Sequence, residues 1–150
     1  MACHMSPIKK LYLSELRRIK KRGIEVRSSR RVFDTLNKKH GFKSIGYFMQ
    51  PNTIYIHPKI KNISYKLSIL LHEEGHWLDK ENSSRFLREY RAQRYMVQRA
   101  VELGNKWLIR HAIRKTTVWL EYKKDVKLCT YAYAAKKLMK TKLWRQLCQN

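Results

Sequence analysis

The chain has 150 residues, of which 43% are hydrophobic, and it carries 34 lysines and arginines against 11 aspartates and glutamates, a net charge of +23. This length and apolar content predict one globular domain and exclude a disordered chain. No apolar run approaches the roughly 18 residues of a membrane-spanning helix, and no signal peptide is recognisable. We therefore expect a protein of the cytoplasm, the nucleoid or the nucleus, without a membrane span.

The first 40 residues predict two helices with a short extended segment between them. Residues 7–22 place apolar side chains at helical spacing after Pro7, and Gly23 is typical of a helix end. Residues 24–26 predict a short strand, and residues 30–40 predict a second helix. Residues 1–5 resemble a cloning remnant and are not counted as functional candidates.

A β-hairpin is predicted in the middle of the chain. Residues 45–49 and 53–57 are rich in β-branched and aromatic side chains, and the turn residues Gln50, Pro51 and Asn52 separate them. Ile54 and Ile56 alternate with other residues, which indicates one buried and one exposed face. Together with the helices, this hairpin predicts an α+β fold that is mostly helical.

The most informative sequence is HEEGH at residues 72–76, which has the form H-E-x-x-H within a predicted helix over residues 62–80. Residues four apart lie on one helix face, so His72 and His76 can bind one Zn²⁺, and Glu73 lies where it can take a proton from the attacking water. The alternative is a solvated helix face with two unrelated histidines. Five of the 11 acidic residues lie between residues 73 and 89, which favours the metal site.

Glu89 is the predicted third zinc ligand. A helix over residues 84–103, closed by Gly104, carries Glu89 at the head of an apolar stripe, where a carboxylate needs a partner. The alternative is an ion pair with Arg85 or Arg88 at the edge of that stripe. Two weaker candidates are Asp79, which is better placed to orient a ligand or cap the helix, and His111, which lies among basic residues.

The remainder of the chain, residues 106–150, predicts a basic helical extension of the same domain. Trp107, Leu108, Ala112 and Trp119 are expected to pack on the core, and residues 131–144 predict a further helix with lysines on its outer side. Cys129 and Cys148 lack C-x-x-C spacing, which predicts free thiols in a reducing compartment.

The HEEGH sequence with Trp77 and Leu78, followed by Glu89-Tyr90-Arg91-Ala92 at the head of a helix, resembles the core of the ImmA/IrrE-type zinc metallopeptidases. The resemblance covers about residues 41–103. It implies a Glu as third ligand on the helix after the H-E-x-x-H helix, a β-hairpin before that helix, and cleavage of a protein, often a DNA-bound repressor. It also implies that an edge strand beside the active-site helix pairs with the extended substrate.

We therefore expect a zinc metallopeptidase in which Glu73 is the general base and the metal is held by His72, His76 and Glu89. Three residues are candidates for stabilising the oxyanion or contacting substrate, and they are not ranked: Tyr55, Tyr90 and His57.

The basic residues gather in the first 43 and the last 45 positions and flank the acidic metal segment. Such a distribution predicts non-specific contact with nucleic-acid phosphates. The N-terminal residues proposed for this surface are Arg17, Arg18, Lys20, Lys21, Arg30 and Arg31. Two alternatives to the peptidase remain: a non-enzymatic nucleic-acid-binding protein with structural zinc or none, and a metal-dependent regulator that binds a partner without cutting it.

Overall fold

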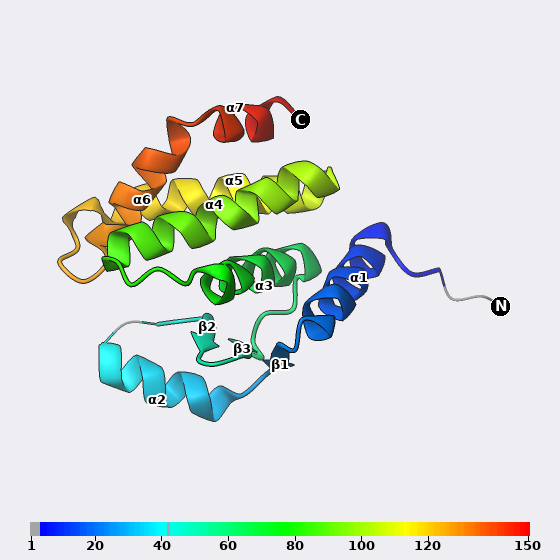
Figure 1. Cartoon of the computed structure of the whole chain (residues 1–150), viewed down its shortest axis with the longest axis horizontal. Helices are drawn as coiled ribbons and strands as arrows, with labels where there is room; N and C mark the ends of the chain where they lie inside the picture. Colours follow the sequence, from blue (N-terminus) through cyan, green and yellow to red (C-terminus); the bar gives the residue numbers. More distant parts are fainter. Residues whose placement is uncertain (1–3, 42) are drawn as a thin grey trace.

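The computed structural model describes residues 4–41 and 43–150, so Cys3 of the expected cloning remnant lies outside the described residues. Helices dominate it, and three short strands form one small sheet, which confirms the predicted α+β class (Figure 1). The elements in chain order are α1 (Pro7–Lys21), β1 (Glu25–Arg27), α2 (Arg30–His40), β2 (Gly46–Met49), β3 (Thr53–Ile56), α3 (Ile63–Leu78), α4 (Arg85–Leu103), α5 (Lys106–Val118), the 3₁₀ helix η1 (Trp119–Lys124), α6 (Cys129–Met139) and α7 (Lys142–Gln149).

Side-chain caps define most of the helix boundaries. Asn62 caps α3 by accepting a hydrogen bond from the Tyr65 N–H, and Ser84 caps α4 by accepting one from the Leu87 N–H. Gly104 ends α4 in the left-handed conformation, with φ of 65°. These signals are local in sequence, so helices α1 to α4 begin and end within about two residues of the predicted positions.

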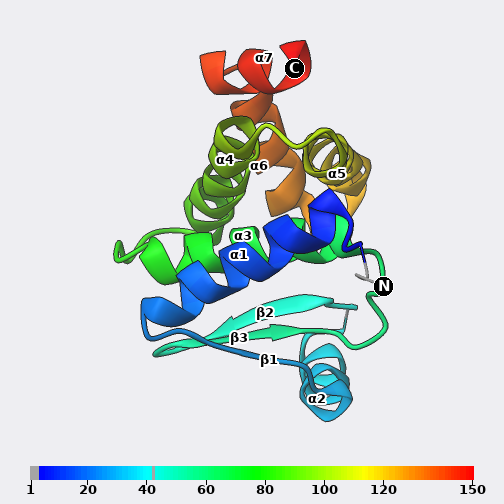
Figure 2. The ribbon, with the colours of Figure 1, turned by 90° about the vertical axis from the view of Figure 1, so that its right-hand side faces the viewer.

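The sheet has the strand order β1-β3-β2, with β1 parallel and β2 antiparallel to β3. Strand β2 is therefore an edge strand. Ile54 and Ile56 are buried on one face of β3, as their alternation predicts. The sheet lies between α2 on one side and the layer of α1 and α3 on the other (Figure 2).

Helix α3 occupies the middle of the molecule. It contacts α1, the strands β2 and β3, and the two long helices α4 and α5 (Figures 1 and 2). Its leucines 67, 70 and 71 are fully buried in the main hydrophobic core. Burying each leucine contributes about 1.5–3 kcal/mol, so a helix surrounded in this way is a rigid support for functional side chains.

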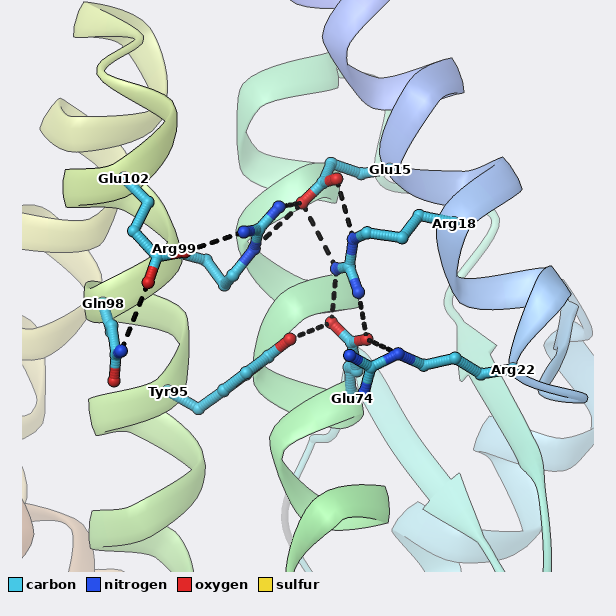
Figure 3. A network of polar contacts seen from close by, with 8 residues as sticks. All are labelled: Glu15, Arg18, Arg22, Glu74, Tyr95, Gln98, Arg99 and Glu102. Carbon is cyan, nitrogen blue, oxygen red and sulfur yellow. Dashed lines mark hydrogen bonds and ion pairs between the residues drawn. The ribbon is translucent and has the colours of Figure 1, made fainter.

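The rear face of α3 is held by a network of polar contacts that ties it to α1 and α4 (Figure 3). Glu74 is fully buried and accepts hydrogen bonds from Arg18 Nη1 and Nη2, at 2.7 Å each, and from the Tyr95 hydroxyl at 2.7 Å. Arg18 and Arg99 both bind Glu15 on α1. The hydrogen bond to Glu74 raises the pKa of Arg18. Burial, together with the hydrogen bond to Glu74 and its charge, raises the pKa of Tyr95 to about 12.

The C-terminal segment shares the core of the rest of the domain. Leu108, Ala112 and Leu147 are fully buried in the main hydrophobic cluster. The single helix predicted over residues 131–144 is wrong, because the chain turns between α6 and α7. The Thr141 hydroxyl caps α7 by accepting a hydrogen bond from the Trp144 N–H, and it donates one to the Leu138 carbonyl. These side-chain hydrogen bonds take the place of helical backbone hydrogen bonds between α6 and α7.

One of the residues expected to pack on the core is exposed. Trp107 is 46% exposed and lies between Lys106 and Arg110, both in cation–π distance of its ring. It lies at the start of α5, where a stripe drawn from periodicity alone leaves the core. None of the described helices combines the length and the apolar character needed to cross a membrane.

Candidate metal centre

The structure brings His72, His76 and Glu89 together. The two histidines are one turn apart on α3, and their ring centroids are 4.9 Å apart. Glu89 lies in the second turn of α4, and its Oε2 atom is 3.1 Å from His72 Nε2 and 3.4 Å from His76 Nε2. One potential ligand atom from each residue lies within 4.8 Å of the others. Two imidazoles and one carboxylate are a ligand set that catalytic zinc sites use.

Without a metal, these three residues form a buried ionic cluster. Burial alone lowers the pKa of His76, but the hydrogen bond and charge of Glu89 outweigh it and raise this pKa to about 9. Burial alone raises the pKa of Glu89, but the hydrogen bonds to His72 and His76 hold it well below its ordinary value. The site therefore keeps a carboxylate ionised in a low-dielectric place, which suits it to a cation.

A chain of hydrogen bonds fixes the orientation of His72. The Thr116 hydroxyl donates to the Ala112 carbonyl at 2.9 Å, so it must accept the bond from Gln93 Nε2 at 2.8 Å. The other side-chain atom of Gln93, Oε1, then faces His72 Nδ1 at 2.7 Å and accepts its proton. With Nδ1–H held by Gln93, Nε2 is the ring nitrogen that faces Glu89, and a metal bound there would take the place of the proton that Nε2 shares with this carboxylate.

Gly75 allows the two ligand-bearing helices to approach each other. A Cβ atom at this position would lie 2.8 Å from Ala92 Cα and 2.9 Å from the Ala92 carbonyl oxygen, both backbone atoms of α4. The approach places the second turn of α4 against the end of α3 that carries the histidines. The role of this glycine is therefore close packing of the two helices.

The side chain of Glu73 differs from those of the three candidate ligands, because its carboxylate has no hydrogen bond or ion pair with any other described residue. Glu73 is 7% exposed, and it lines two adjoining cavities of about 650 and 1000 Å³. Residues common to both cavities are Ser44, Gly46, His72, Glu73 and Tyr131. A carboxylate beside the three ligands, partnered by nothing but the cavity, is free to exchange protons with a molecule bound there.

The edge strand β2 runs directly beside Glu73. A Cβ atom at Gly46 would collide with Ile69 on α3 and would lie 3.2 Å from Glu73 Oε1. Gly46, Tyr47 and Phe48 line the larger cavity. Among the described residues, β2 pairs with β3 on one side and forms the edge of the sheet on the other, and Gly46 at its start lines both cavities beside Glu73.

The three residues expected to contact the oxyanion or substrate do not line either cavity. Tyr55 lies on the central strand β3, and Tyr90 packs against the core under the Lys137 ammonium, 5.0 Å from its ring centroid. His57 is buried against Phe33, and its Nδ1 accepts the Lys59 N–H. The alternation of residues along a strand and their closeness to the motif in sequence do not show which face of the sheet packs against α3, so these three residues could not be placed from the sequence.

Tyr131 on α6 lines both cavities and was missed from the sequence. Its ring contacts Trp119, which in turn contacts His72 edge-on. Burial, reinforced by the charge of Glu89, raises the pKa of Tyr131 to about 12, so its hydroxyl keeps its proton. It lies 42 positions after Glu89 in a different helix, and no sequence pattern links the two.

The two weaker ligand candidates lie outside the three-residue cluster. Asp79 follows the last turn of α3 and pairs with Arg91 at 2.9 Å, which ties the end of α3 to α4. His111 on α5 lines the smaller cavity and is not part of the three-residue cluster.

Five of the six N-terminal basic residues proposed as a nucleic-acid surface are exposed: Arg17, Lys20, Lys21, Arg30 and Arg31. Arg18 is different, because its guanidinium is held between Glu15 and Glu74 in the network behind α3. Its charge is paired with these two carboxylates and stabilises the fold, so Arg18 does not belong to the exposed basic surface. The sequence shows that Arg18 follows Arg17 in a basic helix, but it does not show that the buried Glu74 of α3 lies opposite Arg18.

Comparison of the chain with protein-family models, with curated proteins and with solved structures finds no match.

Proposed function

We propose that the chain is a zinc-dependent metallopeptidase, with His72, His76 and Glu89 as the metal ligands. The observation that carries this proposal is the convergence of these three ligand atoms within 4.8 Å, beside a carboxylate that has no other partner. The ligand set, the fixed tautomer of His72 and the buried negative charge of Glu89 all fit Zn²⁺.

A bound zinc ion would supply Lewis acidity, which polarises the substrate carbonyl and makes water acidic near neutral pH. Glu73 then acts as the general base and acid: it accepts a proton from the attacking water and delivers it to the departing amine. Its freedom from ion pairs supports this role, since a carboxylate held by arginine would be a poor proton carrier.

Two further features support a peptide substrate. The outer edge of β2 borders the larger cavity and can pair with an extended peptide backbone, which would carry the scissile bond past Glu73. Tyr131 lines both cavities, and its hydroxyl, which accepts a hydrogen bond from Arg85 Nη2 at 3.3 Å, can donate its own proton to the carbonyl oxygen as negative charge develops on it. We propose Tyr131 for this role in place of Tyr55, Tyr90 and His57.

The resemblance to ImmA/IrrE-type peptidases belongs to this proposal. Its support here is the arrangement of the motif: a hairpin precedes the H-E-x-x-H helix, and the third ligand lies on the following helix.

The test uses untagged protein, so that no affinity tag binds metal. About one zinc per chain by elemental analysis, lost in His72→Ala, supports the metal site. Hydrolysis of a mixed peptide library, lost in Glu73→Gln with zinc still bound, supports the peptidase. Zinc binding without hydrolysis would favour the metal-dependent regulator, and a chain without zinc would leave only the basic binding protein.

We also propose that the chain contacts nucleic-acid phosphates, because its net charge of +23 is too large to serve solubility alone. The exposed Arg17, Lys20 and Lys21 lie on one stretch of α1 and its end. Binding to a duplex of arbitrary sequence should weaken steeply with salt, and charge-neutral variants of these three residues should lower the slope of log K against log salt by about 1 each. An unchanged slope would contradict this assignment.

A further inference from the structure

The smaller cavity beside Glu73 has a basic wall formed by helix α5. His111, Arg114 and Lys115 are spaced i, i+3 and i+4, so they share one face of the helix, and all three line the cavity. Lys43 lines it as well, ahead of β2. Glu73 is the one acidic residue among the cavity's described lining residues. The larger cavity is different, because Asp79, Glu81 and Glu89 line it.

Lys115 is a cation without an acidic partner among the described residues. Its ammonium lies over the Tyr65 ring, 5.0 Å from the centroid, and it forms no ion pair with a carboxylate there. Burial lowers the pKa of Lys115 to about 8, and the more distant charges of Glu73 and Glu89 offset this only in part. A half-buried ammonium without a counter-ion is costly, so an anion entering the cavity would relieve that cost.

His111 provides a second unsatisfied group in the same cavity. Its Nδ1 atom is buried and has no hydrogen-bond partner, while its ring packs edge-on against Tyr65 with 5.6 Å between centroids. Burial and the neighbouring charges of Arg114 and Lys115 lower the pKa of His111, so the ring is neutral and can donate a hydrogen bond from Nδ1. Buried polar atoms in native proteins nearly always have partners, so this orphan atom, on a residue that lines the cavity, supports a ligand beside it.

We propose that this cavity is a specificity pocket that binds a carboxylate of the substrate next to the scissile bond, with Lys115 and Arg114 as the charged partners and His111 as a hydrogen-bond donor. The inference rests on the proposed peptidase function, because the pocket adjoins Glu73 and His72. The carboxylate has two sources: the side chain of an internal Asp or Glu, or the free C-terminus of a peptide cut one residue from its end.

The first experiment profiles cleavage by the zinc-loaded chain in a peptide library of mixed sequence, with free and amidated C-termini. The expected result is enrichment of Asp and Glu at one position flanking the cut, by about ten-fold or more over Asn and Gln. Cuts confined to the last bond of peptides with free C-termini would assign the pocket to the terminal carboxylate. No preference for either kind of carboxylate would overturn the proposal.

The second experiment removes the pocket charges. Lys115→Gln and Arg114→Gln should each lower the acidic preference by roughly ten-fold, and a Lys115→Glu and Arg114→Glu double variant should favour Lys or Arg at that position. The matched controls are Lys106→Gln and Arg110→Gln, which make the same charge change on α5 but lie outside both cavities, and they should keep the preference. An equal loss in the controls would show that net charge, and not the pocket, sets the preference.

A binding experiment separates the pocket from the chemistry. The N-methylamide of N-acetylglutamate is titrated into isotope-labelled, zinc-loaded protein, with the N-methylamide of N-acetylglutamine as the neutral probe, and the His111 and Lys115 signals are followed by NMR. Shifts with glutamate that are absent with glutamine and absent in Lys115→Gln support the pocket even if no peptide is cleaved, in which case the peptidase proposal alone fails. Equal shifts with both probes, or none with either, overturn the pocket.

Discussion

Glu73 and Glu74 are neighbours in sequence and both are buried, yet they lie in opposite situations on α3. Glu74 faces the rear, where two hydrogen bonds from Arg18 and one from Tyr95 use its carboxylate fully (Figure 3). Glu73 faces the front, beside the three proposed metal ligands, and its carboxylate has no hydrogen-bond or ion-pair partner among the described residues. The rear carboxylate holds the helix in place, and the front one is left available for chemistry.

The same isosteric change at the two positions should therefore have different effects. Glu74→Gln leaves Arg18 with one fewer buried counter-charge, and we expect it to lower the free energy of unfolding by about 3–5 kcal/mol. Glu73→Gln removes an unpaired carboxylate, so stability should stay within about 0.5 kcal/mol while hydrolysis falls by about 10²–10⁴-fold. Urea unfolding and peptide hydrolysis on both zinc-loaded variants measure the two effects.

The control for this pair is the zinc content, which should be about one ion per chain in Glu73→Gln and in folded Glu74→Gln. If Glu73→Gln unfolds as easily as Glu74→Gln, the front carboxylate is structural and the comparison fails.

Tyr131 sharpens the front of the comparison. Tyr131→Phe removes only the hydroxyl, and we expect kcat to fall by about 10²–10³-fold with little change in KM, because the bond forms to charge that develops in the transition state. Tyr122→Phe, in the same smaller cavity but not in the larger one, is the matched control and should lose far less. A rise in KM at constant kcat would instead assign Tyr131 to ground-state binding.

Gln93 tests how the front ligands are held. Gln93→Leu removes the acceptor for His72 Nδ1–H, so the imidazole loses its fixed tautomer, and zinc affinity should fall by about 10–100-fold. Competition with a zinc-binding dye measures the change. Gln98→Leu, on the same helix but exposed, should leave the affinity as it is. Equal affinities of Gln93→Leu and the unchanged chain would mean that packing alone orients His72.

Gly75 lies where α3 packs against α4, so a substitution there tests the spacing of these two helices. A methyl group there meets backbone atoms of α4, so Gly75→Ala should cost about 1–3 kcal/mol of stability and weaken zinc binding by moving Glu89. Because the nearest atoms are the Cα and carbonyl oxygen of Ala92, Ala92→Gly should not rescue the variant. Rescue by Ala92→Gly would show that the contact is between side chains.

The sequence predicted the front of α3 better than its rear or its surroundings. The H-E-x-x-H spacing and the stripe headed by Glu89 depend on helical periodicity alone, so both could be read from one sequence. The partners of Glu74 come from Arg18, 56 positions earlier, and Tyr95. Tyr131 and the basic wall of α5 also enter the site from distant segments. Periodicity fixes which residues share a face of one helix, but not which other helix covers that face.

The pH dependence of the metal-free protein should distinguish the front cluster from the rear network. The pKa of His76 is raised to about 9 by Glu89, so its stabilising charge is fully present below its ordinary value of 6.5 and is lost as the pH rises through 9. The pKa of Glu89 is depressed, so its contribution is present above its ordinary value of 4.5 and is lost as the pH falls. The unfolding free energy of chelated protein should therefore decline between about pH 6.5 and 9, by at most about 1.4 kcal/mol per pH unit.

Glu89→Gln should flatten this decline, whereas Glu15→Gln, which changes only the rear network, should leave its slope as it is. A slope that follows Glu15 instead would place the titrating pair behind α3. In the zinc-loaded chain the same proton is already displaced, so its stability should be flat over this range, and zinc binding should release a proton at neutral pH.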